Sequence, residues 1–255
     1  MDIVIGLTGL FIAAVAAGAL NAVAGGGSLI SFPALVAFGQ PPILANATNT
    51  AALWPGTLSS AVAYSRDTKI YRDLLVTLLI PSLIGGFLGA LALVSTPPEL
   101  FNAIVPFLVL LATLLFAFRE PFTRWLRLGN NEEKVGTLGR VWGFLFQLFV
   151  ATYGGYFGAG MGILMLGSLS VMGLRDIHRM NGLKTILVTL VNVIAFIYFA
   201  VNGLVVWKLA PVMAAGAVIG GYAGARAAKR VDPHYIRIFV IAIGLFVSAW
   251  LFVRK

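Results

Sequence analysis

The sequence contains no cysteine and few charged residues. Without cysteine, disulfide bonds, thiolate metal sites and thiol catalysis are excluded. Charged residues make up 11% of the 255 residues, against about 25% in ordinary soluble domains. None of the nine acidic residues lies in the middle of an apolar segment. This excludes a carboxylate ring for cations and an acidic proton relay of the usual kind. Paired aspartates for intramembrane proteolysis are also missing, and we expect no enzyme.

Apolar residues take the place of the missing charges. They form 60% of the chain, and the mean hydropathy is +0.96. Apolar stretches of about 20 residues recur, which is the length of a helix that crosses a bilayer, and the alternation typical of a membrane barrel is absent. The sequence therefore predicts an all-α integral membrane protein in contact with lipid. In such a protein the net charge of +9 reports orientation, and we expect no nucleic-acid partner.

Glycine-rich runs interrupt two of these apolar segments. They read "AGGGS" at 24–28 and "GAGMG" at 158–162. Because a glycine inside a helix costs about 1 kcal/mol relative to alanine, each run predicts that one helix ends and another begins. The next segments, 28–38 and 162–173, are too short to cross a membrane comfortably. Each interruption therefore predicts a re-entrant or broken-helix hairpin, which is tolerated only where protein or a cavity surrounds it.

The chain repeats itself at a constant offset of 135 residues, which predicts two homologous halves joined by a linker. In each half we expect one hairpin and three full spans. The predicted units are a first membrane repeat at 1–118, a basic linker at 119–139 and a second membrane repeat at 140–255. The matches that carry the register pair Gly25 with Gly160, Gly27 with Gly162, Asn46 with Asn181, Thr50 with Thr185, and Pro98 with Pro233.

Basic residues alternate between corresponding loops of the two halves. Lysine and arginine collect in cytoplasmic loops, so this alternation predicts two repeats inserted in opposite orientations. The linker at 119–139 then lies in the cytoplasm and both termini lie outside, although Arg254 and Lys255 count against that last step. The basic loops are those near 65–72, 174–179 and 226–230, and their neutral counterparts are those near 200–207, 39–44 and 95–98.

The two interruptions are candidates for an anion site. The first N–H groups of a helix have no partner within it, and together with the positive end of the helix dipole they bind anions. Inverted repeats with broken helices are a recurrent transporter architecture, with the substrate near the midplane. Alternatively, the glycines only allow helices to pack closely.

Polar residues at helical spacing begin the third segment of each half. They are Asn46, Asn49 and Thr50 in one half, and Asn181, Lys184 and Thr185 in the other. The asparagines either bind the substrate or only link helices. Lys184 either snorkels to the interface or faces a cavity and helps to neutralise an anion.

Asn21 and Tyr156 occupy corresponding positions just before the breaks, where they either contact a ligand or belong to the core of the bundle. The complete set of predicted substrate-binding residues is Asn21, Gly25, Gly26, Gly27, Ser28, Asn46, Asn49, Thr50, Tyr156, Gly160, Gly162, Asn181, Lys184 and Thr185.

The motif "GALNAVAGGGS" at 18–28, followed by Pro33 and by "NATNT" at 46–50, has a weaker echo around 158–162 and 181–185. In these motifs the chain resembles the TauE/SafE sulfite exporter family, also called the toluene sulfonate uptake permeases. The resemblance covers essentially the whole chain. It implies the movement of sulfite, aromatic sulfonates or related anions across the bacterial inner membrane.

We therefore predict a multi-pass permease for a small sulfur-containing anion, a sulfonate or sulfite, that works by alternating access around the two hairpins without a cofactor. One alternative is an uncoupled anion channel. Another is a membrane scaffold that does not transport and binds a partner enzyme through the linker. A homo-oligomer is also left open.

Overall fold

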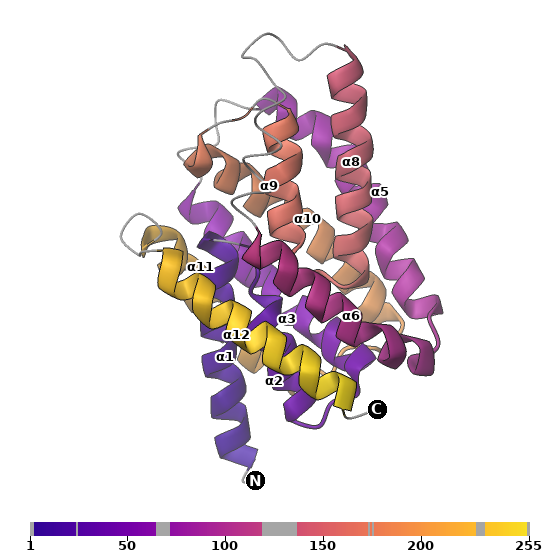
Figure 1. Cartoon of the computed structure of the whole chain (residues 1–255), viewed down its shortest axis with the longest axis vertical. Helices are drawn as coiled ribbons and strands as arrows, with labels where there is room; N and C mark the ends of the chain where they lie inside the picture. The colour runs from indigo at the N-terminus through magenta and orange to yellow at the C-terminus, as the bar shows by residue number, and fades with distance from the viewer. Residues whose placement is uncertain are drawn as a thin grey trace.

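In the computed structural model the chain forms a bundle of helices (Figure 1). The structure describes residues 3–23, 25–64, 72–118, 137–172, 174, 176–227 and 233–253. These residues contain helices and no strand, so the all-α prediction is confirmed. The helices are α1 (Ile3–Val23), α2 (Ser28–Ala37), α3 (Pro42–Ala63), α5 (Arg72–Ser95), α6 (Pro98–Ala117), α8 (Thr137–Tyr156), α9 (Met161–Val171), α10 (Ile177–Val201), α11 (Ala210–Ala227) and α12 (Pro233–Val253).

Four helices among the described residues are long and apolar enough to cross a membrane. They are Val4–Val23, Leu74–Ser95, Pro98–Ala117 and Arg179–Val201. Large apolar side chains such as Ile80, Phe107 and Phe246 lie exposed on the outside of the bundle, as in a protein surrounded by lipid. The chain is therefore a multi-pass membrane protein by length, composition and surface.

Helix α3 has 22 residues but lies inside the bundle instead of facing the apolar exterior. Its first half carries Asn46, Thr48, Asn49 and Thr50, and all four are buried. Because a polar side chain in hydrocarbon is costly unless another group satisfies it, this sequence is stable in a membrane only where protein surrounds it. The neighbours of α3 are α10 and α11.

Helices from the two halves of the sequence pack in matched pairs. Helix α1 packs along α11, α8 packs along α5, α3 packs on α10, and α6 packs on α12. Small residues allow the close approach in both of the first two pairs. On α11, Gly220 lies against the backbone carbonyl of Val15, and on α5, Gly89 lies against that of Thr152. Exchanging the halves turns the α1–α11 pair into the α8–α5 pair.

The predicted helix breaks are confirmed. Helix α1 ends before Gly25, which has φ +83° and donates its N–H to the Leu20 carbonyl at 3.1 Å. Helix α8 ends in the same way before Gly158, which has φ +77° and donates to the Tyr153 carbonyl at 3.4 Å. A positive φ is where glycine is favoured over all other residues. The two α1–α2 and α8–α9 hairpins enter the bundle from opposite ends (Figure 1).

The predicted linker lies almost entirely outside the described residues. Helix α8 begins at Thr137, so the last three residues assigned to the linker at 119–139 belong to the second helical half. The breaks also differ from the gap-free repeat. Val23 and Tyr156, which end α1 and α8, are 133 residues apart, whereas Pro42 and Ile177, which begin α3 and α10, are 135 apart. The second half is therefore two residues shorter between the break and α10.

Candidate functional site

The two helix breaks touch each other. A methyl group placed on Gly25 would lie 2.7 Å from the Cα of Gly162, and one placed on Gly162 would lie 2.7 Å from the Cα of Gly25. No real Cβ tolerates such a distance, so the two backbones meet where only glycine fits. The hairpins of the two halves, far apart in the sequence, thus form one centre.

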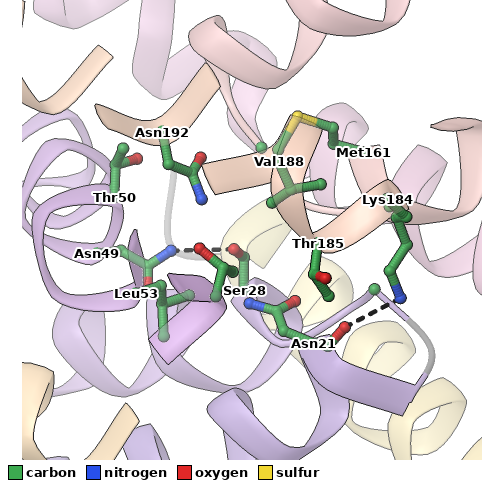
Figure 2. A pocket seen from close by; sticks show the side chains of 14 residues that line it. Asn21, Ser28, Asn49, Thr50, Leu53, Met161, Lys184, Thr185, Val188 and Asn192 are labelled. Atoms are coloured by element: carbon green, nitrogen blue, oxygen red, sulfur yellow. Dashed lines mark hydrogen bonds between the residues drawn. The ribbon is translucent and has the colours of Figure 1, made fainter. Parts of the chain in front are cut away.

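A small cavity lies beside this contact between the breaks (Figure 2). Its volume is about 20 Å³, which corresponds to one or two water molecules. Eight of the fourteen predicted site residues line it. The lining residues are Asn21, Gly25, Ser28, Asn49, Thr50, Leu53, Thr57, Gly158, Met161, Gly162, Lys184, Thr185, Val188 and Asn192.

Helices α3 and α10 contribute corresponding faces to the cavity. Each presents four positions, and the two sets are related by the 135-residue offset. The pairs are Asn49 with Lys184, Thr50 with Thr185, Leu53 with Val188, and Thr57 with Asn192. The repeat found in the sequence is therefore also a repeat of positions in the cavity wall.

Six lining residues were not predicted from the sequence. Leu53, Thr57, Val188 and Asn192 continue the predicted polar faces by one and two helical turns, so residues at the spacing i+4 and i+8 would have found them. Thr57 also accepts a hydrogen bond from the Thr189 hydroxyl at 3.1 Å, which joins α3 to α10. Gly158 and Met161 belong to the second break itself.

Asn49 ties the start of α2 to α3. Its Nδ2 donates to Ser28 Oγ at 3.1 Å, and its Oδ1 accepts a hydrogen bond from the Ser31 hydroxyl at 2.5 Å (Figure 2 shows the bond between Asn49 and Ser28). Ser31 and Asn49 are fully buried, and Ser28 nearly so. Asn49 thus fixes the position of the first turn of α2 relative to the cavity.

Lys184 is buried, with 1% of its surface exposed. Its ammonium donates to the backbone carbonyls of Asn21 at 3.2 Å and Ala22 at 3.4 Å, and to Asn181 Oδ1 at 2.9 Å (Figure 2). The snorkelling alternative is therefore wrong, because the side chain crosses to the last turn of α1 in the other half. The negative end of the α1 dipole favours a cation at this position.

Asn21 connects the first break to Lys184. Its carbonyl accepts from Lys184, while its side-chain Oδ1 accepts from the Gly27 N–H at 2.8 Å. One residue thus binds the end of α1 to the start of α2. The N–H of Gly27 is consequently occupied and is not one of the donors available to a ligand.

The remaining predicted residues lie near the breaks without lining the cavity. Gly26 packs on the ring of Phe116, and Gly27 lies against the Ala17 carbonyl. Gly160, with φ +77°, caps the start of α9 and packs on α6. Asn181 holds Lys184. Their roles in the structure are those of packing and positioning.

Asn46 and Tyr156 meet at the end of α8. Asn46 Nδ2 donates to the Tyr156 carbonyl at 2.8 Å, so α3 caps the end of the broken helix of the other half. The Tyr156 hydroxyl lies 3.3 Å from Thr96 Oγ1, after the end of α5. Its side chain therefore points away from the cavity, at the α5–α6 connection.

The chemistry of the cavity wall is that of hydrogen-bond donors. Within the described residues, the N–H groups of Ser28 and Gly162 have no acceptor, and both residues line the cavity. The hydroxyls of Thr50 and Thr185 and the amide of Asn192 are beside them. Among the described residues no group of histidine and acidic side chains could hold a metal ion. The wall is suited to a small anion.

Known proteins of the same kind place these observations in a family. The model of the family described as "Sulfite exporter TauE/SafE" matches residues 10–251. A "Probable membrane transporter protein" of Haemophilus influenzae is 30% identical, over 98% of this chain and 96% of its own length. The "Probable membrane transporter protein ORF9" of a Sinorhizobium species is 29% identical, over 92% of this chain and 88% of its own.

A third relative is the "Probable membrane transporter protein YfcA" of Escherichia coli K12, which is 26% identical over 94% of this chain and 87% of its own length. No solved structure matches the chain significantly. The relatives are described as transporters, and their names specify no substrate.

Proposed function

This chain belongs to the sulfite exporter TauE/SafE family of membrane transporters, and we propose that it moves a small sulfur-containing anion, a sulfonate or sulfite, across the bacterial inner membrane. The observation that supports the proposal most directly is the cavity where the two breaks meet. A cation, Lys184, and the unpaired N–H groups of Ser28 and Gly162 converge there. A sulfonate presents several oxygens that share one negative charge, and this donor set fits them.

Lys184 contributes to anion binding through the field of its ammonium. A buried charge is strongly destabilising unless other groups satisfy it. Neutral oxygens of Asn21, Ala22 and Asn181 bind this ammonium. Because these partners carry no formal charge, the ammonium keeps its net positive charge at the edge of the cavity. An anion in the cavity would complete the neutralisation.

The small volume of the cavity supports alternating access. A space of about 20 Å³ is smaller than an ion with four or more non-hydrogen atoms requires, so the two hairpins must separate for the substrate to enter. We propose that the halves are inverted repeats, as their matched helix pairs and alternating basic loops support. The centre would then open first to one side and then to the other.

The proposal is tested with purified protein in liposomes, by measuring the flux of radiolabelled sulfite and of an aromatic sulfonate. We expect saturable flux of at least one anion, and a pH gradient imposed in parallel reports whether protons are coupled. Flux that rises linearly with concentration would favour an uncoupled channel. A protein that moves neither anion, while an enzyme co-purifies with it, would overturn the proposal in favour of a scaffold.

A matched pair of variants tests the site. Asn192→Leu removes an amide from the cavity wall, and Asn202→Ala removes one from the exposed end of α10, where it binds the Tyr198 carbonyl. We expect only Asn192→Leu to raise the KM for the anion. An unchanged KM in both variants would contradict the assignment of the cavity.

A further inference from the structure

The oxygen of one buried amide has no partner. Asn46 has 1% of its surface exposed, and its Oδ1 is a buried atom with no hydrogen bond, although its Nδ2 donates to the Tyr156 carbonyl. Reversing the amide would place two oxygens against each other, so the oxygen is the unpaired atom. An unsatisfied buried acceptor costs about 1–3 kcal/mol, which calls for a ligand.

The other half of the chain shows what occupies the corresponding place. Asn181, 135 residues after Asn46, directs its Oδ1 to the ammonium of Lys184 at 2.9 Å. The same ammonium binds two carbonyls in the last turn of α1. Lys184 corresponds to Asn49 in the first half, and Asn49 instead binds Ser28 and Ser31. The first half therefore lacks the ammonium that satisfies the second.

The surroundings of the Asn46 oxygen favour positive charge. Asn46 lies at the last turn of α8, just as Lys184 lies at the last turn of α1. Carbonyl groups at the end of a helix carry the negative end of its dipole, and the ends of broken helices in transporters coordinate Na⁺. The oxygens placed here are neutral, which suits a monovalent cation better than a divalent one.

We propose that the last turn of α8 and Asn46 Oδ1 form a binding site for a small monovalent cation, Na⁺, at the place where Lys184 supplies a built-in cation in the other half. The site is distinct from the anion cavity, because Asn46 does not line that cavity. Its use as a coupling site rests on the proposed anion transport: one Na⁺ moving with one monovalent anion would make the transport cycle electrically neutral.

The test is thermal unfolding of the full chain in detergent, in NaCl and in choline chloride at equal ionic strength. We expect Na⁺ to raise the unfolding midpoint in a saturable manner. Asn46→Leu should abolish this rise, and Asn46→Asp, which supplies a charged oxygen, should lower the Na⁺ concentration for half-maximal effect by tenfold or more. Asn181→Leu is the matched control, and its Na⁺ response should persist because its oxygen already binds Lys184.

Three outcomes would overturn the cation site. They are a midpoint that is equal in NaCl and choline chloride, a Na⁺ response that persists in Asn46→Leu, and an unchanged Na⁺ affinity in Asn46→Asp. If Asn46→Leu does not fold, Asn46→Asp and equilibrium binding of ²²Na⁺ to the wild type decide the question. No anion is present in these measurements. Loss of the Na⁺ response with intact anion flux therefore refutes the cation site alone, and the reverse result refutes the proposed function alone.

Discussion

Replacing Gly25 by alanine tests whether the contact between the two breaks holds the halves together. Gly25 has φ +83°, and Gly39, after the end of α2, has φ +94°. Both substitutions force alanine into a conformation that costs roughly 1–2 kcal/mol. The two sites differ in space, because a Cβ at Gly39 meets nothing within 4 Å, whereas one at Gly25 lies 2.7 Å from the Cα of Gly162.

The difference between these variants isolates the contact between the breaks. Ordinary contact begins at 3.4 Å, so the breaks must separate by 3.4 − 2.7 = 0.7 Å or more to admit the methyl group. Overpacking of this kind costs typically 1–3 kcal/mol. We therefore expect Gly39→Ala to lower the free energy of unfolding by about 1–2 kcal/mol and Gly25→Ala by about 2–5 kcal/mol.

Unfolding in mixed detergent micelles measures the difference, and flux in liposomes shows its effect on transport. We expect Gly39→Ala to keep its flux and Gly25→Ala to lose most of it, because the substrate centre is displaced. Equal losses of stability in the two variants would refute the reasoning. That result would mean that only the backbone angle, and not the approach of Gly162, requires glycine at Gly25.

Other substitutions should act through the contacts described above. Asn192→Leu should raise the KM of the anion about tenfold or more, since a hydrogen bond to a charged group contributes about 1.5–3 kcal/mol, and Asn202→Ala serves as its control in the same flux assay. Lys184→Met should lower the free energy of unfolding by about 2–5 kcal/mol, because the oxygens that bind the ammonium lose their donor, and should abolish flux; a folded, active variant would show that the charge is dispensable. Gly220→Ala should loosen the α1–α11 contact, because its methyl group would overlap the Val15 carbonyl, whereas Gly9→Ala, with nothing within 4 Å, should be neutral or stabilising; equal unfolding midpoints would contradict the packing described.

The helix breaks were predictable from sequence because glycine acts locally. A run such as Gly25-Gly26-Gly27 disfavours a helix whatever surrounds it, and the chain ends α1 at Val23 and begins α2 at Ser28. The cavity residues on α3 and α10 were partly predictable for a similar reason. Residues at i+4 share a face of any helix, so Asn49 and Lys184 mark the faces on which Thr57 and Asn192 also lie.

The separate roles of Asn46 and Asn49 were not predictable. They are three residues apart on one helix and of the same type, yet Asn46 reaches the end of α8 and Asn49 reaches the start of α2. Both partners come from other helices, so the spacing along α3 carries no information about them. The direction of the Tyr156 side chain, toward Thr96 instead of the cavity, depends equally on the position of α5.

The sequence by itself determined that this is a helical membrane protein of two related halves with a break in each, because composition, glycine runs and a repeat are properties of the chain. Only the tertiary structure decided what Lys184 does. Its position on α10 is compatible with snorkelling or with a cavity, and the choice depends on the end of α1, which is 163 residues away in sequence and 3.2 Å away in space. A buried charge is stable only beside the groups that satisfy it, and here those groups are brought by the packing of one half on the other.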